Sequence, residues 1–267
     1  MNVWLALVLG LVQGICEFLP VSSSGHLLLI SKLAGVDVEQ GGAFFTVMLH
    51  LATLVAVCLV YRKTLWQLVR RPFQKTVGLL LLATVPTVVI ALLLKTALSS
   101  FYDSMEGGAF LGVSFLITAA LLLGCDLFMA RKKPKRKMAD MKVRDALAIG
   151  GMQAVGILPG VSRSGATISG AVFSGLDRRA AADFSFLMSI PAILGGAVLE
   201  GRDALAAGMT GVPLLPLLVG MAAAGVTGYF AIRFMIRLIT QKKLIGFAIY
   251  TAVLGVAATV LQLLGKI

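Results

Sequence analysis

The most informative property of this sequence is its shortage of charged residues. Only 13% of its 267 residues are Asp, Glu, Lys or Arg, whereas a soluble domain has about 25%. Hydrophobic residues make up 58%, and the runs 77–94, 109–123 and 214–232 contain no charge at all. This composition excludes a disordered chain, a secreted disulfide scaffold and a cytosolic enzyme, and it predicts an integral membrane protein.

Cysteine is also scarce. The three cysteines, Cys16, Cys58 and Cys125, lie in apolar surroundings at spacings that fit neither a metal site nor a disulfide framework. We therefore expect them to be small packing residues. No basic residue precedes Lys32, so a cleaved signal peptide is not expected.

The net charge of +12 comes from basic residues that cluster between the apolar runs. Of 24 Lys and Arg residues, 19 fall in four patches: 62–75, 131–144, 178–179 and 233–243. Cytoplasmic loops of membrane proteins carry such an excess of positive charge, which also contacts anionic lipid. Because no aromatic or RNA-binding signature accompanies the patches, we predict no nucleic-acid partner.

The apolar runs predict the number of membrane spans. A spanning helix needs about 20 mostly apolar residues, and six segments meet this requirement: 43–61, 77–98, 108–130, 182–200, 212–233 and 244–264. Two further stretches, 2–33 and 146–175, are interrupted midway by Pro, Gly, Ser and charge, so that each arm is too short to span. We interpret both as re-entrant helical hairpins in an all-α polytopic membrane protein.

The two predicted hairpins are similar in sequence. At an offset of 140 residues, identical residues align, among them Gln13 with Gln153, Ser22 with Ser162, Ser24 with Ser164 and Gly25 with Gly165. Each half contains one hairpin and three spans, an odd number, so the second half must be inverted. We predict a single membrane domain of two inverted-topology repeats, about 1–130 and about 142–267, whose broken segments meet near the bilayer midplane. If the basic patches are cytoplasmic, both termini lie outside.

Polar residues concentrate at the breaks of the two hairpins. The first break reads QGICEFLPVSSSGH (13–26) and the second reads LPGVSRSGAT (158–167). Glu17 and Gln13 are four residues apart and share one helix face, and a carboxylate inside an apolar segment is a functional candidate. Arg163 is the only basic residue within the second break. Hydroxyls, glycines and an arginine suit a tetrahedral oxyanion, because arginine and helix-start amides both bind phosphate.

If the two breaks meet, groups that bind an anion lie next to an acid–base pair and a nucleophile. The residues concerned are Glu17, Ser22, Ser23, His26, Ser162, Arg163, Ser164 and Thr167. This set favours phosphoryl transfer, in which catalysis is mainly positioning and charge stabilisation. His26 follows Ser23 by three residues, so it is predicted to share a helix face with Ser23 and to accept its proton. The sequence leaves open whether Ser23 forms a covalent intermediate or positions water.

Three other interpretations compete with this one. In a purely structural interpretation, the serines cap broken helices and Arg163 pairs with Glu17. A transporter or flippase of an anionic polyprenyl-phosphate lipid would also have inverted repeats with broken helices. The membrane phosphatases that use a Ser-Arg-x5-His nucleophile are excluded, because the position of that histidine is occupied by Ser169 here.

His50, within a span, is expected to be a hydrogen-bonded packing residue.

The motifs Gln13-x-x-x-Glu17, FLPVSSSGH (18–26) and PGVSRSGAT (159–167) closely resemble those of bacterial undecaprenyl-pyrophosphate phosphatases, the bacitracin-resistance family. Length and span pattern fit as well, so the resemblance covers essentially the whole chain, and the motifs together are highly specific. The resemblance implies hydrolysis of undecaprenyl pyrophosphate to undecaprenyl phosphate and inorganic phosphate. This reaction recycles the lipid carrier of peptidoglycan synthesis and gives bacitracin resistance.

The resemblance also implies roles for individual residues. The residues implied as catalytic are Glu17, Ser23, His26 and Arg163. Those implied to bind the substrate phosphates are Ser22, Ser24, Ser162, Arg163, Ser164 and Thr167. A divalent metal, Mg²⁺ or Ca²⁺, would be held by Glu17 and Gln13. Gln13 stands where many members have glutamate, and its uncharged amide oxygen is expected to bind a hard cation more weakly.

The family resemblance carries expectations about location and partners. It implies a multi-pass protein of the bacterial inner membrane whose site faces the periplasm. The expected partners are the bilayer and a polyprenyl pyrophosphate lipid, for which bacitracin competes. The sequence does not decide between a monomer and a homodimer.

Overall fold

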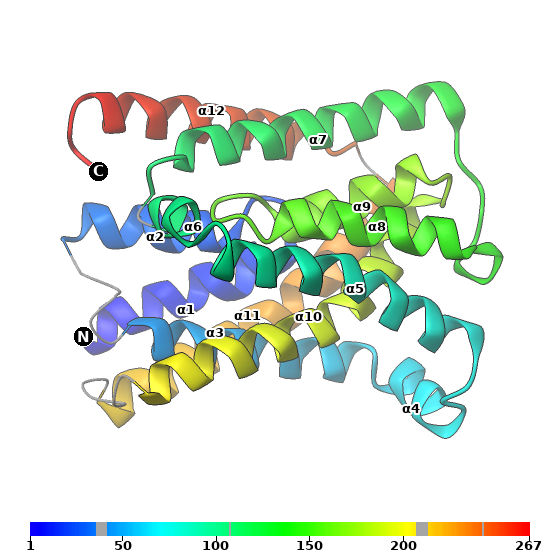
Figure 1. Ribbon diagram of the computed structural model, residues 1–267, viewed down its shortest axis with the longest axis horizontal. Coiled ribbons are helices and arrows are strands. Elements are labelled where there is room, and N and C mark those ends of the chain that lie inside the picture. Colours follow the sequence, from blue (N-terminus) through cyan, green and yellow to red (C-terminus); the bar gives the residue numbers. More distant parts are fainter. Residues whose placement is uncertain (36–41, 107, 207–212, 242) are drawn as a thin grey trace.

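The computed structural model describes residues 1–35, 42–106, 108–206, 213–241 and 243–267, which form a bundle of helices (Figure 1). No strand occurs among these residues, so the predicted all-α class is confirmed. The described α-helices are α1 (Val3–Phe18), α2 (Ser23–Leu33), α3 (Gly42–Val60), α4 (Arg62–Arg70), α5 (Lys75–Thr96), α6 (Ser99–Glu106), α7 (Leu111–Lys132), α8 (Val143–Gly156), α9 (Arg163–Phe173), α10 (Arg178–Ala206), α11 (Leu214–Gln241) and α12 (Ile245–Leu263), with one 3₁₀ turn at Met138–Asp140.

Five of these helices, α5, α7, α10, α11 and α12, are long and apolar enough to cross a membrane, and α3 with α4 makes a sixth candidate bent by 81°. The chain is therefore a multi-pass membrane protein, as predicted. The sequence interpretation did not include α4, a helix of nine residues that is too short to span a membrane by itself. Leu65 and Leu68, three residues apart, pack against the core and explain why this segment is helical.

Both breaks are helical hairpins whose long arms begin at opposite ends of the bundle (Figure 1). In the first hairpin, α1 ends at Phe18 before Pro20, and in the second, α8 ends at Gly156 before Pro159. Proline cannot continue a helix because it lacks the N–H donor and its ring clashes with the preceding turn. Each short arm then starts from a serine cap, Ser22 or Ser162, whose Oγ accepts the backbone N–H three residues later.

Each long arm packs on a helix of the other half of the chain. A Cβ atom at Gly10 of α1 would overlap the Gly220 carbonyl of α11, and one at Gly150 of α8 would overlap the Ala83 carbonyl of α5. Only glycine permits such close approach of two helix backbones. Gly10 and Gly150 are 140 residues apart, so these contacts are consistent with the inverted repeat. The repeat boundaries remain a prediction.

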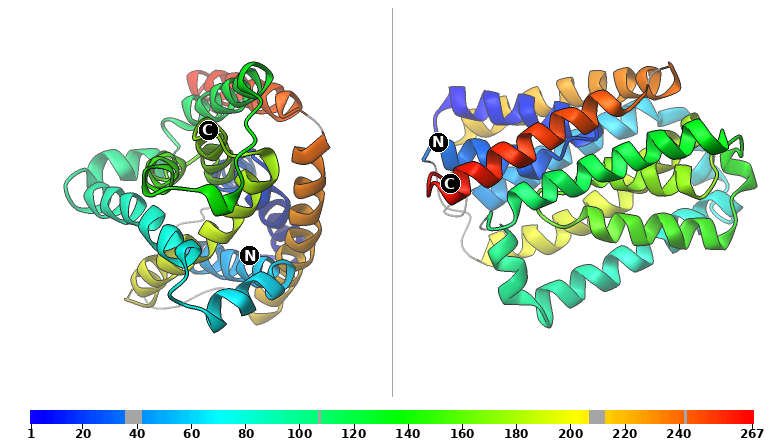
Figure 2. Two further views of the ribbon diagram at one scale, coloured as in Figure 1. Left: turned by 90° about the vertical axis from the view of Figure 1, so that its right-hand side faces the viewer. Right: turned by 90° about the horizontal axis from the view of Figure 1, so that it is seen from above.

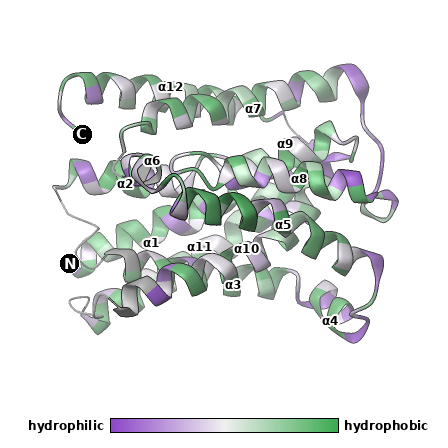
Figure 3. Ribbon diagram, viewed as in Figure 1, coloured by the Kyte–Doolittle hydropathy of each residue, from purple (hydrophilic) through white to green (hydrophobic). Residues whose placement is uncertain are grey.

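The two ends of the bundle differ in charge. The four basic patches meet at one end, hereafter the basic end, and both termini lie at the other (Figures 1 and 3). At the basic end, Arg136 donates to Asp145 at 2.6 Å and to the Ser174 carbonyl at 2.8 Å, which ties the start of α8 to the end of α9. Burial raises the pKa of Asp145, but the hydrogen bond and charge of Arg136 prevail and lower it.

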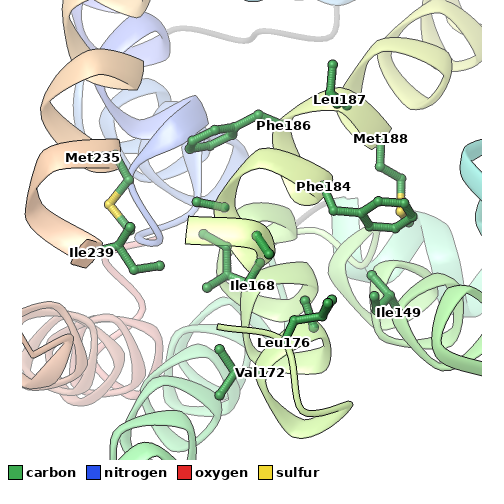
Figure 4. Packing of buried hydrophobic residues seen from close by; sticks show 14 of the residues in the cluster. Ile149, Ile168, Val172, Leu176, Phe184, Phe186, Leu187, Met188, Met235 and Ile239 are labelled. Atoms are coloured by element: carbon green, nitrogen blue, oxygen red, sulfur yellow. The ribbon is translucent and has the colours of Figure 1, made fainter. Parts of the chain in front are cut away.

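The largest apolar cluster includes residues of the second hairpin and of the spanning helices that pack on it. Phe184 and Phe186 of α10 pack there with Ile168 of α9 and Met235 of α11 (Figure 4). This cluster holds α9 against the spanning helices, whereas α12 lies along α7 at the edge of the bundle (Figure 2). The short arm of the second hairpin is therefore more buried than that of the first, because nine of the 11 residues of α9 are buried against five of the 11 of α2.

Candidate active site

The two hairpins meet at their tips, defined here as residues 17–26 and 157–167. The Ser164 hydroxyl of the second tip donates to the Leu19 carbonyl of the first at 3.1 Å. The Gly160 N–H donates to the Ser24 hydroxyl at 3.3 Å. Because both contacts cross from one tip to the other, they fix the distance between the two motifs and form a single polar site.

Glu17 is the centre of this site. Its side chain is 6% exposed, and its Oε1 accepts a short hydrogen bond from Nη2 of Arg163. Its Oε2 accepts the Ser23 hydroxyl at 2.7 Å and the Gln13 amide at 3.1 Å. Nε2 of His50 lies 3.6 Å from the same oxygen. One buried carboxylate therefore joins the predicted nucleophile, the predicted phosphate ligand and two side chains from α1 and α3.

Arg163 is only half satisfied by this arrangement. Its Nη2 pairs with Glu17, but its Nη1 is buried and has no hydrogen-bond partner among the described residues. A buried donor without a partner costs free energy, so such a group in a native structure calls for an acceptor. Arg163 is also the first residue of α9, where backbone N–H groups favour an anion. The geometry is that of an anion site with one arm of the guanidinium available.

His26 lies elsewhere than the sequence predicted. Its Nδ1 donates to the Ser22 carbonyl at 2.7 Å, and its Nε2 is 2.7 Å from the hydroxyl of Tyr250 on α12. Because a carbonyl can only accept, Nδ1 carries the proton in this arrangement and Nε2 receives the Tyr250 hydroxyl. The predicted contact between His26 and Ser23 is wrong for this structure, since the Ser23 hydroxyl donates to Glu17 instead.

Two site residues were missed by sequence reasoning. His50 was expected only to pack, yet it faces Glu17, while its Nδ1 donates to the Thr46 carbonyl at 2.9 Å. Its position as an ionisable group within a span was the signal that could have identified it. Tyr250 stacks on His26 with an interplanar angle of 13°. No spacing rule links residues 224 positions apart, so Tyr250 carried no sequence signal.

The hydroxyls predicted to bind phosphate are mostly engaged within the tips. Ser22 and Ser162 cap α2 and α9, as the structural interpretation expected. Thr167 is fully buried and lies 2.6 Å from the Ser185 hydroxyl. Ser24 is the exposed member of the set. The phosphate-binding roles of these residues remain predictions, and the structure shows that most of them also hold the tips in place.

The site offers few donors to a metal ion. Among the described residues, no group of three or more His, Cys, Asp or Glu side chains is placed to hold one. Gln13, however, is fully buried and its Oε1 has no partner in the described part of the chain. An amide oxygen beside a carboxylate is a donor set suited to a hard cation, and Mg²⁺ is usually bound by one or two carboxylates together with substrate phosphates. By the type of their donor atoms, these two residues would fit a metal that the substrate helps to hold; in this structure the amide nitrogen of Gln13 is the atom that faces Glu17.

Comparison with known proteins places this chain in a family. The sequence model of the family described as "Bacitracin resistance protein BacA" matches residues 6–257. An undecaprenyl-diphosphatase of Carboxydothermus hydrogenoformans is 41% identical, with all of both chains covered. Undecaprenyl-diphosphatase 4 of Bacillus thuringiensis subsp. konkukian is 40% identical with 97% of each covered, and an undecaprenyl-diphosphatase of Alkaliphilus metalliredigens is 38% identical with 99% of this chain and all of the relative covered. This chain belongs to the bacitracin resistance protein BacA family.

Proposed function

We propose that this protein is a membrane phosphatase that hydrolyses undecaprenyl pyrophosphate to undecaprenyl phosphate and inorganic phosphate. The relatives that match over essentially their whole length bear the name undecaprenyl-diphosphatase. Recycling of this lipid carrier supports cell-wall synthesis and accounts for the bacitracin resistance in the family's description.

One observation carries the proposal. Glu17 accepts the Ser23 hydroxyl on one oxygen and the Arg163 guanidinium on the other, while Nη1 of Arg163 has no partner among the described residues. A purely structural ion pair would use the arginine fully. Here the pair holds a hydroxyl nucleophile, a proton acceptor and a free anion-binding arm within one site, which is the set that phosphoryl transfer requires.

The first chemical step follows from these contacts. The Ser23 Oγ attacks the terminal phosphorus of the pyrophosphate and its proton passes to Oε2 of Glu17, which already accepts that hydroxyl at 2.7 Å. The bond between the terminal phosphorus and the bridging oxygen breaks, and undecaprenyl phosphate leaves with the proton that Glu17 passes to it, so that Glu17 is ionised again. Arg163 stabilises the charge on the transferred phosphoryl group through its planar guanidinium.

The second step releases inorganic phosphate. Water attacks the phosphorus of phosphorylated Ser23 while the ionised Glu17 accepts the water proton. The bond between phosphorus and Oγ breaks, Oγ takes that proton from Glu17 and becomes the Ser23 hydroxyl again, and inorganic phosphate leaves. In the competing version of the reaction, Ser23 only orients a water molecule that attacks the substrate directly.

His26 holds the turn at the start of α2 through the Ser22 carbonyl, so its role in both versions of the reaction is to fix the position of the neighbouring Ser23.

A divalent cation, Mg²⁺ or Ca²⁺, is part of the proposal. A pyrophosphate brings several negative charges, whereas Arg163 is already balanced by Glu17. Glu17 and the free Oε1 of Gln13 would hold the cation, which would supply positive charge to the phosphates when bound. The expected dependence on added metal is tested by activity before and after chelation.

The proposed location is the bacterial inner membrane, with the site open toward the periplasm. The positive-inside rule places the basic end in the cytoplasm and both termini outside. Bacitracin would then compete for the pyrophosphate lipid on the periplasmic side.

The proposal is tested by phosphate release from undecaprenyl pyrophosphate by the purified chain in detergent. We expect metal-dependent release of one phosphate per lipid, which Glu17→Gln lowers by about 10²–10⁴-fold because the proton acceptor is lost. Glu200→Gln, the same substitution at an exposed residue of α10, is the matched control and should keep its activity. Lipid exchange across vesicles without any phosphate release would contradict the phosphatase and favour the transporter.

A further inference from the structure

Helix α4 turns sharply away from the direction of the bundle. Its axis is bent by 81° from that of α3, which packs along the spanning helix α11 (Figure 1). A helix at this angle runs close to parallel with the membrane surface. The bend is held in place because the buried Tyr61, between the two helices, donates its hydroxyl to Asp183 of α10 at 2.7 Å. Leu65 and Leu68 pack on the largest apolar cluster, so the direction of the outer face of α4 is fixed.

The outer face of α4 is apolar. Trp66 is 59% exposed and Val69 is 70% exposed, and the two residues share one side of the helix because they are three positions apart. Phe73, in the turn that leads to α5, is fully exposed. None of these three side chains stabilises the core. Large apolar side chains that gather on a surface mark a contact with an apolar phase or with a partner.

Basic side chains accompany this apolar face. The segment 62–75 contains five Lys and Arg residues and no Asp or Glu, so its charge is +5. Lys63, Arg70 and Arg71 are all exposed. Cζ of Arg70 lies 4.8 Å from the centre of the Trp66 ring, a cation–π contact that keeps the guanidinium beside the apolar face. Apolar and positively charged groups are therefore presented to the same surroundings.

The position of α4 favours a lipid surface as the partner. The helix and the turn after it join the end of α3 at Val60 to the start of α5 at Lys75, so they lie at the level where these apolar helices leave the bilayer. Tryptophan settles at the headgroup level of a membrane, and arginine extends from there to the phosphates. A second copy of this chain would bring another segment of charge +5 to this face, and like charges repel.

We propose that α4 lies in the headgroup region of the membrane and binds anionic lipid. Trp66, Val69 and Phe73 insert toward the acyl chains, while the basic side chains of the segment 62–75 contact the phosphates of lipids of the phosphatidylglycerol class. This contact requires only that the chain spans a membrane, so it does not depend on the phosphatase reaction.

The depth of α4 is measured by tryptophan fluorescence in bilayers. The chain has two tryptophans, so Trp4→Phe leaves Trp66 as the single emitter. The full-length variant is reconstituted with lipids brominated either near the glycerol or at the chain ends. We expect strong quenching by the first lipid, weaker quenching by the second, and little quenching by aqueous acrylamide. Val69→Asn/Phe73→Asn should expose Trp66 to acrylamide, whereas the control Gln67→Asn, at another exposed position of α4, should not.

The preference for anionic lipid is measured in the same single-tryptophan protein. The readout is the ratio of the binding constants of brominated phosphatidylglycerol and brominated phosphatidylcholine next to Trp66. Lys63→Gln/Arg71→Gln should lower this ratio by about fivefold for each charge removed. The control Lys133→Gln/Lys135→Gln removes two exposed charges after α7 at the same end and should leave the ratio unchanged. Equal losses in both double variants would overturn the proposal, because the attraction would then be general to the basic end.

Two further results would also overturn it. Quenching of Trp66 by acrylamide but not by brominated lipid would place the outer face of α4 in water. Protection of Trp66 from both quenchers would show that a protein, either a second copy or a soluble partner, covers this face. Every substituted residue is exposed, so the variants are expected to keep the unfolding temperature of the parent protein in detergent.

Discussion

The two hairpin tips share one framework but carry different chemistry. Each has a proline break, a serine cap and a glycine in the long arm that contacts a helix of the other half. At the 140-residue offset, Ser23 aligns with Arg163, and each is the first residue of its short helix. Equivalent positions of the two tips therefore bring the proposed nucleophile and the proposed phosphate ligand to the same carboxylate, that of Glu17.

The long arms diverge one turn before the tips. Gln13 and Gln153 align, both are fully buried, and the Oε1 of each has no partner among the described residues. Gln13 donates its amide to Glu17, whereas Gln153 donates to Thr87 at 3.0 Å. The position that matches Glu17 in the second hairpin is Ile157. The hairpin scaffold therefore occurs in both halves of the chain, whereas a carboxylate at the position of Glu17 occurs only in the first.

The largest effect is expected at the nucleophile of the first tip. Ser23→Ala removes the hydroxyl that donates to Glu17 and should lower kcat by about 10⁴-fold or more, because no other group can form the covalent intermediate. Ser31→Ala, also buried on α2, is the matched control and should stay near wild type. If Ser23→Ala keeps a tenth of the wild-type rate, the first tip only positions water and the direct version of the reaction holds.

The corresponding position in the second tip should give the next largest effect. Arg163→Lys keeps the charge but loses the planar fork, so a contact worth about 3–4 kcal/mol is lost and the rate falls about 10²–10³-fold. Arg233→Lys, on an exposed face of α11, is the control. Phosphate release by the lysine variant at the wild-type rate would place the phosphate away from Arg163.

The shared framework is tested by stability rather than by activity. Gly150→Ala places a Cβ against the Ala83 carbonyl, and such overpacking costs about 1–3 kcal/mol. At Gly151, the next residue, a Cβ would meet nothing within 4 Å, so Gly151→Ala should gain up to about 1 kcal/mol from helix propensity. Thermal unfolding in detergent measures both. Equal unfolding temperatures would show that α8 and α5 do not pack as described.

The smallest effect is expected at a contact that only the first tip has. Tyr250→Phe keeps the ring that stacks on His26 but removes its hydroxyl, and loss of one hydrogen bond is worth about 1 kcal/mol, or about fivefold in kcat. Tyr229→Phe removes a hydroxyl that accepts from Arg233 and serves as the control. A change in KM alone would instead assign Tyr250 to substrate binding.

Much of this comparison could be predicted from the sequence. Proline, serine and glycine at the breaks specify the hairpins through backbone rules that act over a few residues. The 140-residue offset and the odd number of spans then predict that the two tips approach from opposite sides. The joining of Glu17 to Arg163 was also anticipated, although only as a structural alternative.

The partners of the two histidines could not be predicted. Sequence spacing placed His26 beside Ser23, but side chains on a helix turn back toward its N-terminus, and His26 reaches the Ser22 carbonyl instead. Its second partner, Tyr250, comes from the last helix. His50 faces Glu17 because of the way α3 packs near α1, and no local pattern encodes that rotation.

The most direct test of the account is the covalent state of Ser23 during turnover. The purified chain is mixed with undecaprenyl pyrophosphate and metal, quenched with acid within one turnover and digested for mass spectrometry. The account predicts phosphate on the peptide that contains Ser23, at a level that approaches the enzyme concentration when hydrolysis of the intermediate is slow. Phosphate release at the wild-type rate with no phosphorylated Ser23, together with turnover by Ser23→Ala, would contradict it.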